Sequence, residues 1–142
     1  MIEIPLEIIN LNDDGFHILV EVVVFGETFK AVIDTGASKT VFDKNIVETN
    51  LEAKENLLLS DKLSTGLGTN SMESYTLAIS SLHIGALAIS AFELAVLDLS
   101  MINQAYERLE IGQIIGVVGG DILMEYGAVI HYPLQKLFLR NI

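Results

Sequence analysis

Alternation of apolar and polar residues dominates the chain and predicts a mostly β protein. In residues 2–8, aliphatic side chains alternate with Glu or Pro, and Pro5 is typical of an edge strand. Residues 16–25 are rich in Val and Ile, and residues 28–33 resume the pattern after Gly26-Glu27. Since a pair that contains glycine suits a tight turn, these two segments predict a β-hairpin.

A second hairpin of the same design is predicted later in the chain. Residues 75–84 alternate, Gly85-Ala86 can turn the chain, and residues 87–97 return. The alternation changes phase at Ser80-Ser81. A phase change inside a strand predicts a β-bulge at that position.

The two predicted hairpins end in similar sequences. The first ends in Ala31-Val32-Ile33-Asp34-Thr35-Gly36, and the second in Ala95-Val96-Leu97-Asp98-Leu99-Ser100. In each, an aspartate directly follows the last apolar residue of the strand. This likeness indicates a diverged internal duplication, in which Asp34 and Asp98 hold equivalent places.

One or two short helices are expected in the second half of the chain. Residues 101–109 have a helical apolar period, with Ser100 as N-cap and Gly112 as the stop. Residues 121–126 predict a shorter helix that ends at Gly127. The expected apolar face of the first helix comprises Met101, Ile102, Ala105, Tyr106 and Leu109.

Residues 128–132 and 137–140 predict a closing hairpin, whereas the pattern in residues 48–60 is ambiguous. A length of 142 residues with 51% hydrophobic residues is sufficient for one folded domain, expected over residues 1–142.

The charge and the residue types exclude several classes of function. A formal net charge of −11 opposes binding to a phosphate backbone, so a nucleic-acid partner is not expected. The chain has no cysteine, and its three histidines are far apart, so we expect neither a metal site nor a cofactor and interpret the histidines as strand-surface residues. We see no signal peptide and no apolar run long enough to span a membrane, which favours a cytoplasmic location.

The segment Asp34-Thr35-Gly36-Ala37-Ser38 carries the most distinctive chemistry. It places a carboxylate directly after an apolar strand, with two hydroxyl side chains and a glycine around it. Glycine allows a tight backbone turn, and hydroxyl groups can hold a carboxylate by hydrogen bonds. An ordinary turn aspartate is the alternative for this triplet read alone.

Together with a second motif, this segment resembles the active-site loop of the retropepsin-like aspartic peptidases. The second motif, two aliphatic residues and a glycine before a short helix, is Val117-Val118-Gly119. The resemblance covers about residues 16–140 and implies the retropepsin-like acid protease fold, a closed, barrel-like β domain. Relative to the compact viral enzymes, the chain is longer in residues 48–60 and 101–110.

The resemblance also implies how the protein would work. Asp34 would be the single catalytic residue of each chain, so that a homodimer supplies the two carboxylates for hydrolysis of a peptide or protein substrate. Thr35 and Gly36 would support the loop and contact the substrate backbone, and Gly119 would let the loop pack closely against the second motif. The expected flap, residues 62–76, has Gly66, Leu67 and Gly68 at its tip.

Three alternatives remain open from the sequence. The same fold could be a catalytically silent dimeric module that binds peptides or proteins, with Asp34 as a relic. The chain could also be an unrelated all-β domain. Asp98 could provide a second acid within one chain, but Leu99 and Ser100 replace Thr and Gly there, so we interpret Asp98 as a structural turn residue.

Overall fold

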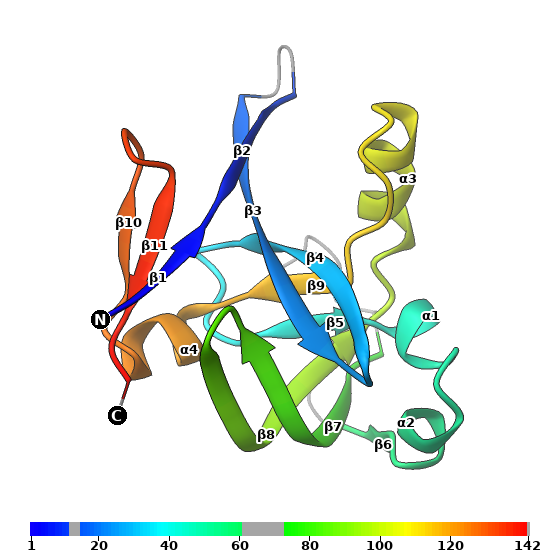
Figure 1. The fold of residues 1–142 in the computed structure, drawn as a ribbon. Coiled ribbons are helices and arrows are strands. Elements are labelled where there is room, and N and C mark those ends of the chain that lie inside the picture. Colours follow the sequence, from blue (N-terminus) through cyan, green and yellow to red (C-terminus); the bar gives the residue numbers. More distant parts are fainter. Residues whose placement is uncertain (12–14, 61–72, 142) are drawn as a thin grey trace.

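The computed structural model describes residues 1–11, 15–60 and 73–141, and it confirms a mostly β protein (Figure 1). In chain order the elements are β1 (Ile2–Pro5), β2 (Glu7–Asn10), β3 (Phe16–Val24), β4 (Glu27–Ile33), β5 (Val41–Asp43), α1 (Lys44–Val47), α2 (Leu51–Glu55), β6 (Leu58–Leu59), β7 (Tyr75–Ile84), β8 (Leu87–Leu97), α3 (Ser100–Arg108), β9 (Gly116–Val118), α4 (Gly120–Glu125), β10 (Val129–His131) and β11 (Lys136–Leu139).

Six strands close into a barrel. In the order β3-β4-β9-β5-β8-β7, each strand is hydrogen-bonded to the next, and pairing of β7 with β3 completes the ring. The strands β2 and β6 extend this sheet outside the ring. Fully buried side chains such as Phe42, Leu82 and Ile115 fill the interior. Because the ring has no open edge, its strands satisfy one another's backbone groups.

The predicted internal duplication is confirmed by the way the two hairpins share their short strands. The β3–β4 hairpin is followed by β5, and the β7–β8 hairpin is followed by β9. However, β5 pairs in parallel with β8, and β9 pairs in parallel with β4. Each half of the chain therefore completes the sheet of the other half.

The N-terminal alternation forms two strands instead of one. The strand β1 pairs with β11 in a separate three-stranded sheet with the order β1-β11-β10, whereas β2 pairs with β3 at the edge of the larger sheet. The chain changes sheets at Pro5-Leu6, where Pro5 has no backbone N–H to donate. Both ends of the chain thus lie at the small sheet, as Figure 1 shows.

The bulge expected at Ser80-Ser81 is wrong. The pairs Ile79↔Phe92 and Ser81↔Ser90 have the same register, so no extra residue is inserted. Instead, the buried face changes on both strands at this level, and Ala91 on β8 has a φ of 52°. The whole hairpin therefore bends, which lets its far end reach β3 and close the barrel.

Both predicted helices are present as α3 and α4, and two further short ones, α1 and α2, lie at residues 44–55. The expected face of α3 is partly wrong. Tyr106 is buried as expected, but Met101, Ala105 and Leu109 are exposed, and the unpredicted Asn103 is buried. Polar contacts of Asn103, described below, decide which face is buried. Among the described residues, no helix has the length and apolar character needed to cross a membrane.

Candidate active site

The loop of residues 34–40 connects β4 to β5 and carries Asp34 at the surface. Within it, the Gly36 N–H donates to Oδ1 of Asp34 at 2.9 Å, and the Ala37 N–H donates to the Asp34 carbonyl at 3.2 Å. The Asp34 N–H donates to the Val118 carbonyl at 3.0 Å. The carboxylate is thus held in a tight turn that is joined to β9, and its side chain remains exposed.

The start of α4 packs directly behind this loop, with glycines at the contact. A Cβ atom at Gly119 would lie 2.5 Å from the Lys39 carbonyl oxygen and 2.9 Å from that of Ala37. The Gly120 N–H donates to the Ala37 carbonyl at 2.7 Å. Since carbon and oxygen cannot approach to 2.5 Å without repulsion, only glycine allows this backbone-to-backbone contact.

Thr40 and Asp121 link the same two segments and were not predicted from the sequence. Thr40 is fully buried, and its hydroxyl donates to Oδ1 of Asp121 at 2.7 Å while it accepts from the Gly119 N–H at 3.1 Å. The Thr40 N–H donates to the same carboxylate. The available signal was a hydroxyl residue at the end of the Asp34 loop and an acid just after Gly119-Gly120.

On the neighbouring strand, His17 lies beside Asp34. The antiparallel pairing of β3 with β4 reaches Leu19↔Val32, two residues from His17 and Asp34, and both of these residues line one recess. His17 is half-buried, and its Nδ1 forms a hydrogen bond with the hydroxyl of Tyr106 from α3. His17 thus lies on a strand as predicted, and the contact with Tyr106 of α3 covers part of its side chain.

Tyr106 is only 3% exposed, and its environment alters its acidity. Burial, and then the negative charge of Asp34, raise the pKa of Tyr106 to about 12. The hydroxyl thus keeps its proton over the whole neutral range.

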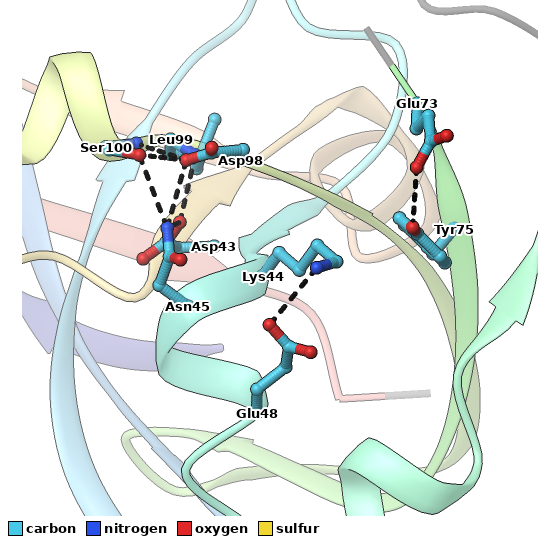
Figure 2. A network of polar contacts seen from close by, with 9 residues as sticks. All are labelled: Asp43, Lys44, Asn45, Glu48, Glu73, Tyr75, Asp98, Leu99 and Ser100. Atoms are coloured by element: carbon cyan, nitrogen blue, oxygen red, sulfur yellow. Dashed lines mark hydrogen bonds and ion pairs between the residues drawn. The ribbon is translucent and has the colours of Figure 1, made fainter.

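Asp98 lies at the other end of the barrel strands. The strand β9 is parallel to β4 and antiparallel to β5, and β5 is parallel to β8. The strand β8, which ends just before Asp98, therefore runs in the opposite direction to β4, which ends just before Asp34. Asp98 accepts from the hydroxyl and N–H groups of Ser100 and from Asn45, as Figure 2 shows. The hydrogen bonds from Ser100 lower the pKa of Asp98, and this geometry agrees with a structural turn residue.

A buried polar network attaches α3 to the barrel. Asp43 is 2% exposed and accepts from the Leu99 N–H at 2.9 Å (Figure 2) and from Nδ2 of Asn103 at 3.4 Å. Asn103 also accepts from the Ile114 N–H at 2.8 Å and donates to the Ile114 carbonyl at 3.2 Å. These contacts fix the helix that brings Tyr106 towards Asp34.

The expected flap tip, Gly66 to Gly68, lies outside the described residues. Among the described residues that follow position 72 in the chain, Tyr75 donates to Glu73 at 2.7 Å, and the Lys44 ammonium lies 5.4 Å from the centre of the Tyr75 ring. Lys44 also contacts Glu48 at 3.2 Å, as Figure 2 shows. Among residues 1–11, 15–60 and 73–141, no group of three His, Asp or Glu side chains could hold a metal ion.

Comparisons with known proteins agree with this geometry. Residues 20–122 match the family described as aspartyl protease. A retropepsin-like aspartic protease from Rickettsia conorii has a similar structure, with a TM-score of 0.59 and 22% identity over 99% of this chain and 89% of that chain. A search of curated protein sequences found no significant match.

Two further solved structures are similar. The retroviral protease-like domain of Ddi1 from Leishmania major gives a TM-score of 0.58 at 16% identity, over 87% of this chain and 88% of that chain. The EIAV protease complexed with the inhibitor HBY-793 gives a TM-score of 0.52 at 16% identity, over 80% of this chain and 90% of that chain. These likenesses confirm the predicted retropepsin-like fold.

Proposed function

The chain belongs to the aspartyl protease family, and on that premise we propose that it is an aspartic endopeptidase whose active site forms between two copies. The observation that carries this proposal is the placement of Asp34. Its carboxylate is exposed. The loop that carries it is held from behind by the close backbone contacts at Gly119 and Gly120 and by the hydrogen bond between Thr40 and Asp121. Such a loop can present an acid rigidly to a partner.

The proposed reaction needs two carboxylates, one ionised and one protonated. Asp98 cannot supply the second one, because it lies at the other end of the strands and its oxygen is engaged by Ser100 and Asn45. A dimer with two-fold symmetry would bring two Asp34 side chains together. Two carboxylates about 3 Å apart share one proton and titrate as a coupled pair.

In this mechanism the ionised Asp34 takes a proton from a water molecule held between the two acids. The water oxygen attacks the scissile carbonyl carbon, and the protonated Asp34 gives its proton to the carbonyl oxygen. In the collapse of the tetrahedral intermediate, the C–N bond breaks and the leaving amine takes the proton that the first Asp34 gained from the water. A hydroxyl of the intermediate returns its proton to the second Asp34, so that one acid is again ionised and one protonated. No metal or cofactor takes part in this scheme.

The neighbouring residues receive supporting roles by analogy with the family. Thr35 of each chain would bond across the two-fold axis, while Gly36 would contact the extended substrate backbone. Ala37 and Ser38 would continue the substrate-facing side of the loop. Val117 and Val118 would back it. The residues Gly66, Leu67 and Gly68 would close over the substrate as a flap.

Replacing Asp34 by asparagine tests the proposal. We expect Asp34→Asn to abolish cleavage of a fluorogenic peptide library between pH 4 and 7.5, because an amide cannot exchange the proton. The matched control is Asp98→Asn, which also turns an exposed carboxylate into an amide and should keep activity. Full activity of folded Asp34→Asn protein would reject the assignment. Peptide binding by the unmodified protein without any cleavage would favour a silent binding module.

A further inference from the structure

Two pairs of strands project beyond the barrel next to Asp34. Figure 1 shows that the β2–β3 ribbon and the β10–β11 hairpin extend in the same direction. Residues of both line one recess of about 280 Å³, among them Phe16 at the start of β3 and Tyr132 directly after β10. Asp34 and Thr35 line the same recess. Whatever covers this surface therefore lies against the proposed active site.

The two faces of the β2–β3 ribbon have different surroundings. On one face, Leu11 and Leu19 are buried in a small apolar cluster with Tyr106 of α3. The hydrogen bond between Tyr106 and His17 joins α3 to the same face. Since two strands alone are only marginally stable, α3 acts as a brace that stiffens this ribbon.

The opposite face of the ribbon exposes an aromatic side chain. Phe16 and Ile18 alternate with His17 along β3, so they point to the face that α3 does not cover. Ile18 is buried, whereas Phe16, at the outer end of β3, is 67% exposed. Tyr132, which lines the same recess, is 57% exposed. Exposed apolar surface of this kind marks an interaction site, and aromatic residues are enriched in protein–protein interfaces.

The edge of the small sheet next to the recess is open. Among the described strands, only β11 pairs with β10, so the outer edge of β10 is unpaired there. The strand β1 at the opposite edge contains Glu3 and Pro5, and both residue types discourage pairing with another chain. The strand β10 contains neither proline nor an acidic residue nor lysine. Its edge can therefore accept a strand of a partner.

The charges of this surface allow a second copy to approach. Each chain has a net charge of −11, so two copies repel each other unless their contact surface carries little charge. Among the described residues that line the recess, Asp34 is the only acid, and none is Lys or Arg. In the proposed reaction Asp34 shares a proton with its copy, which reduces the repulsion at that point.

We propose that Phe16, Tyr132 and the outer edge of β10 form one docking surface for a second copy of this chain, beside the Asp34 loop. This inference rests on the proposed function: Thr35 is expected to bond across the two-fold axis, so the partner covers the surface that is continuous with Thr35. In a two-fold interface the same surface occurs on both copies, so each aromatic side chain contributes twice. Buried aromatic anchors provide much of the affinity of such interfaces.

Serine variants measured by analytical ultracentrifugation test this surface. We expect Phe16→Ser and Tyr132→Ser each to raise the dissociation constant of the dimer at least about thirtyfold, because each change removes two aromatic anchors. The matched control is Leu51→Ser, which also replaces a large exposed apolar side chain, on α2, and should leave the constant unchanged. All three side chains are exposed, so the variants should fold, and circular dichroism verifies this.

Footprinting of the unmodified protein tests the same surface without a substitution. Hydroxyl-radical labelling is compared at concentrations well above and well below the dissociation constant. We expect Phe16 and Tyr132 to be labelled about threefold less in the dimer, because the core of an interface excludes water. Leu51 should be labelled equally at both concentrations. Labelling of Phe16 and Tyr132 that decreases only when a peptide is added would assign the surface to substrate and overturn the inference.

The outcomes separate this inference from the proposed function. A dimer with Asp34-dependent cleavage whose dissociation constant neither Phe16→Ser nor Tyr132→Ser changes would overturn the docking surface and keep the peptidase assignment. A dimer that depends on Phe16 and Tyr132 but shows no Asp34-dependent cleavage would keep the docking surface and reject the assignment. A chain that stays monomeric at every concentration would reject both.

Discussion

Gly119 shows how a missing side chain determines the position of the candidate acid. The backbone of the Asp34 loop lies so close to the start of α4 that a Cβ at Gly119 would lie 2.5 Å from the Lys39 carbonyl oxygen. At the adjacent Gly120 the nearest atom would lie 3.3 Å away, which a small shift can accommodate. The two glycines thus provide a matched pair.

We therefore predict that Gly119→Ala lowers the free energy of unfolding by about 2 to 3 kcal/mol, the usual range for overpacking. Gly120→Ala should cost less than about 1 kcal/mol. Urea unfolding followed by circular dichroism measures both. Equal stability of the two variants would show that the close contact is not rigid.

Tyr106 gives a prediction about pH. Its pKa rises from the ordinary 10.0 to about 12 in the folded state. Below pH 10 the phenol is protonated in both states. Between pH 10 and 12 the unfolded chain loses the proton and the folded chain keeps it, so the stability falls as the pH rises. The expected loss is about 2 kcal/mol between pH 9 and 11.5.

Comparison of the unmodified protein with Tyr106→Phe at these two pH values isolates the effect. The Phe variant has no phenol at this position. From pH 9 to 11.5 its free energy of unfolding should therefore fall by about 2 kcal/mol less than that of the unmodified protein. Parallel declines in both proteins would mean that Tyr106 does not titrate as its burial implies.

At the scale of elements, α3 depends on a polar anchor. Asn103 is buried and bonds both backbone groups of Ile114 as well as the Asp43 carboxylate. We expect Asn103→Ala to destabilise the protein by about 2 to 3 kcal/mol, because these buried groups lose their partner. The neighbouring Gln104→Ala changes an exposed residue and should have little effect.

Hydrogen exchange of the α3 amides measures where the loss occurs. Protection should fall in residues 100–108 before it falls in the barrel strands, since local opening frees the helix first. Unchanged protection of α3 in Asn103→Ala would show that apolar packing of the helix is sufficient.

At the scale of the whole molecule, the proposed dimer predicts how mixtures behave. If two Asp34 side chains form one site, a mixed dimer of unmodified and Asp34→Asn chains is inactive. After subunit exchange, an equal mixture should retain about a quarter of the activity of the same total concentration of unmodified protein, because random pairing makes one dimer in four fully unmodified.

Peptidase assays after co-refolding of the two chains test this value. An equal mixture with Asp98→Asn, which is expected to be active, should retain full activity. Half activity in the Asp34→Asn mixture would mean that each chain works independently and would contradict a shared site.

Much of the fold was predictable because alternation reports which strand face is buried. The two hairpins, the closing hairpin and the helices near residues 101–109 and 121–126 follow from local pattern and glycine stops. The motif at Asp34 and its partner at Val117-Val118-Gly119 identified the family that the comparison later matched. These features are local, so the chain itself carries them.

Contacts between distant segments were decided only by the tertiary structure. The split of residues 2–8 between two sheets depends on their partners: β1 pairs with β11, and β2 pairs with β3. These two partner strands are more than a hundred residues apart in the chain. The link from Thr40 to Asp121 and the pair formed by His17 and Tyr106 join residues 81 and 89 positions apart. A local period does not report which distant residues meet, because these contacts arise when the barrel closes and α3 docks.

The sequence by itself thus indicated Asp34 as the candidate acid and predicted the long hairpins and the helices α3 and α4. The tertiary structure decided how Asp34 is held, that Asp98 lies at the opposite end of the strands, and that His17 and Asp34 line the same recess. The physical reason is that side-chain type and local period are properties of neighbours in the chain, whereas orientation and burial depend on the packing of the whole barrel.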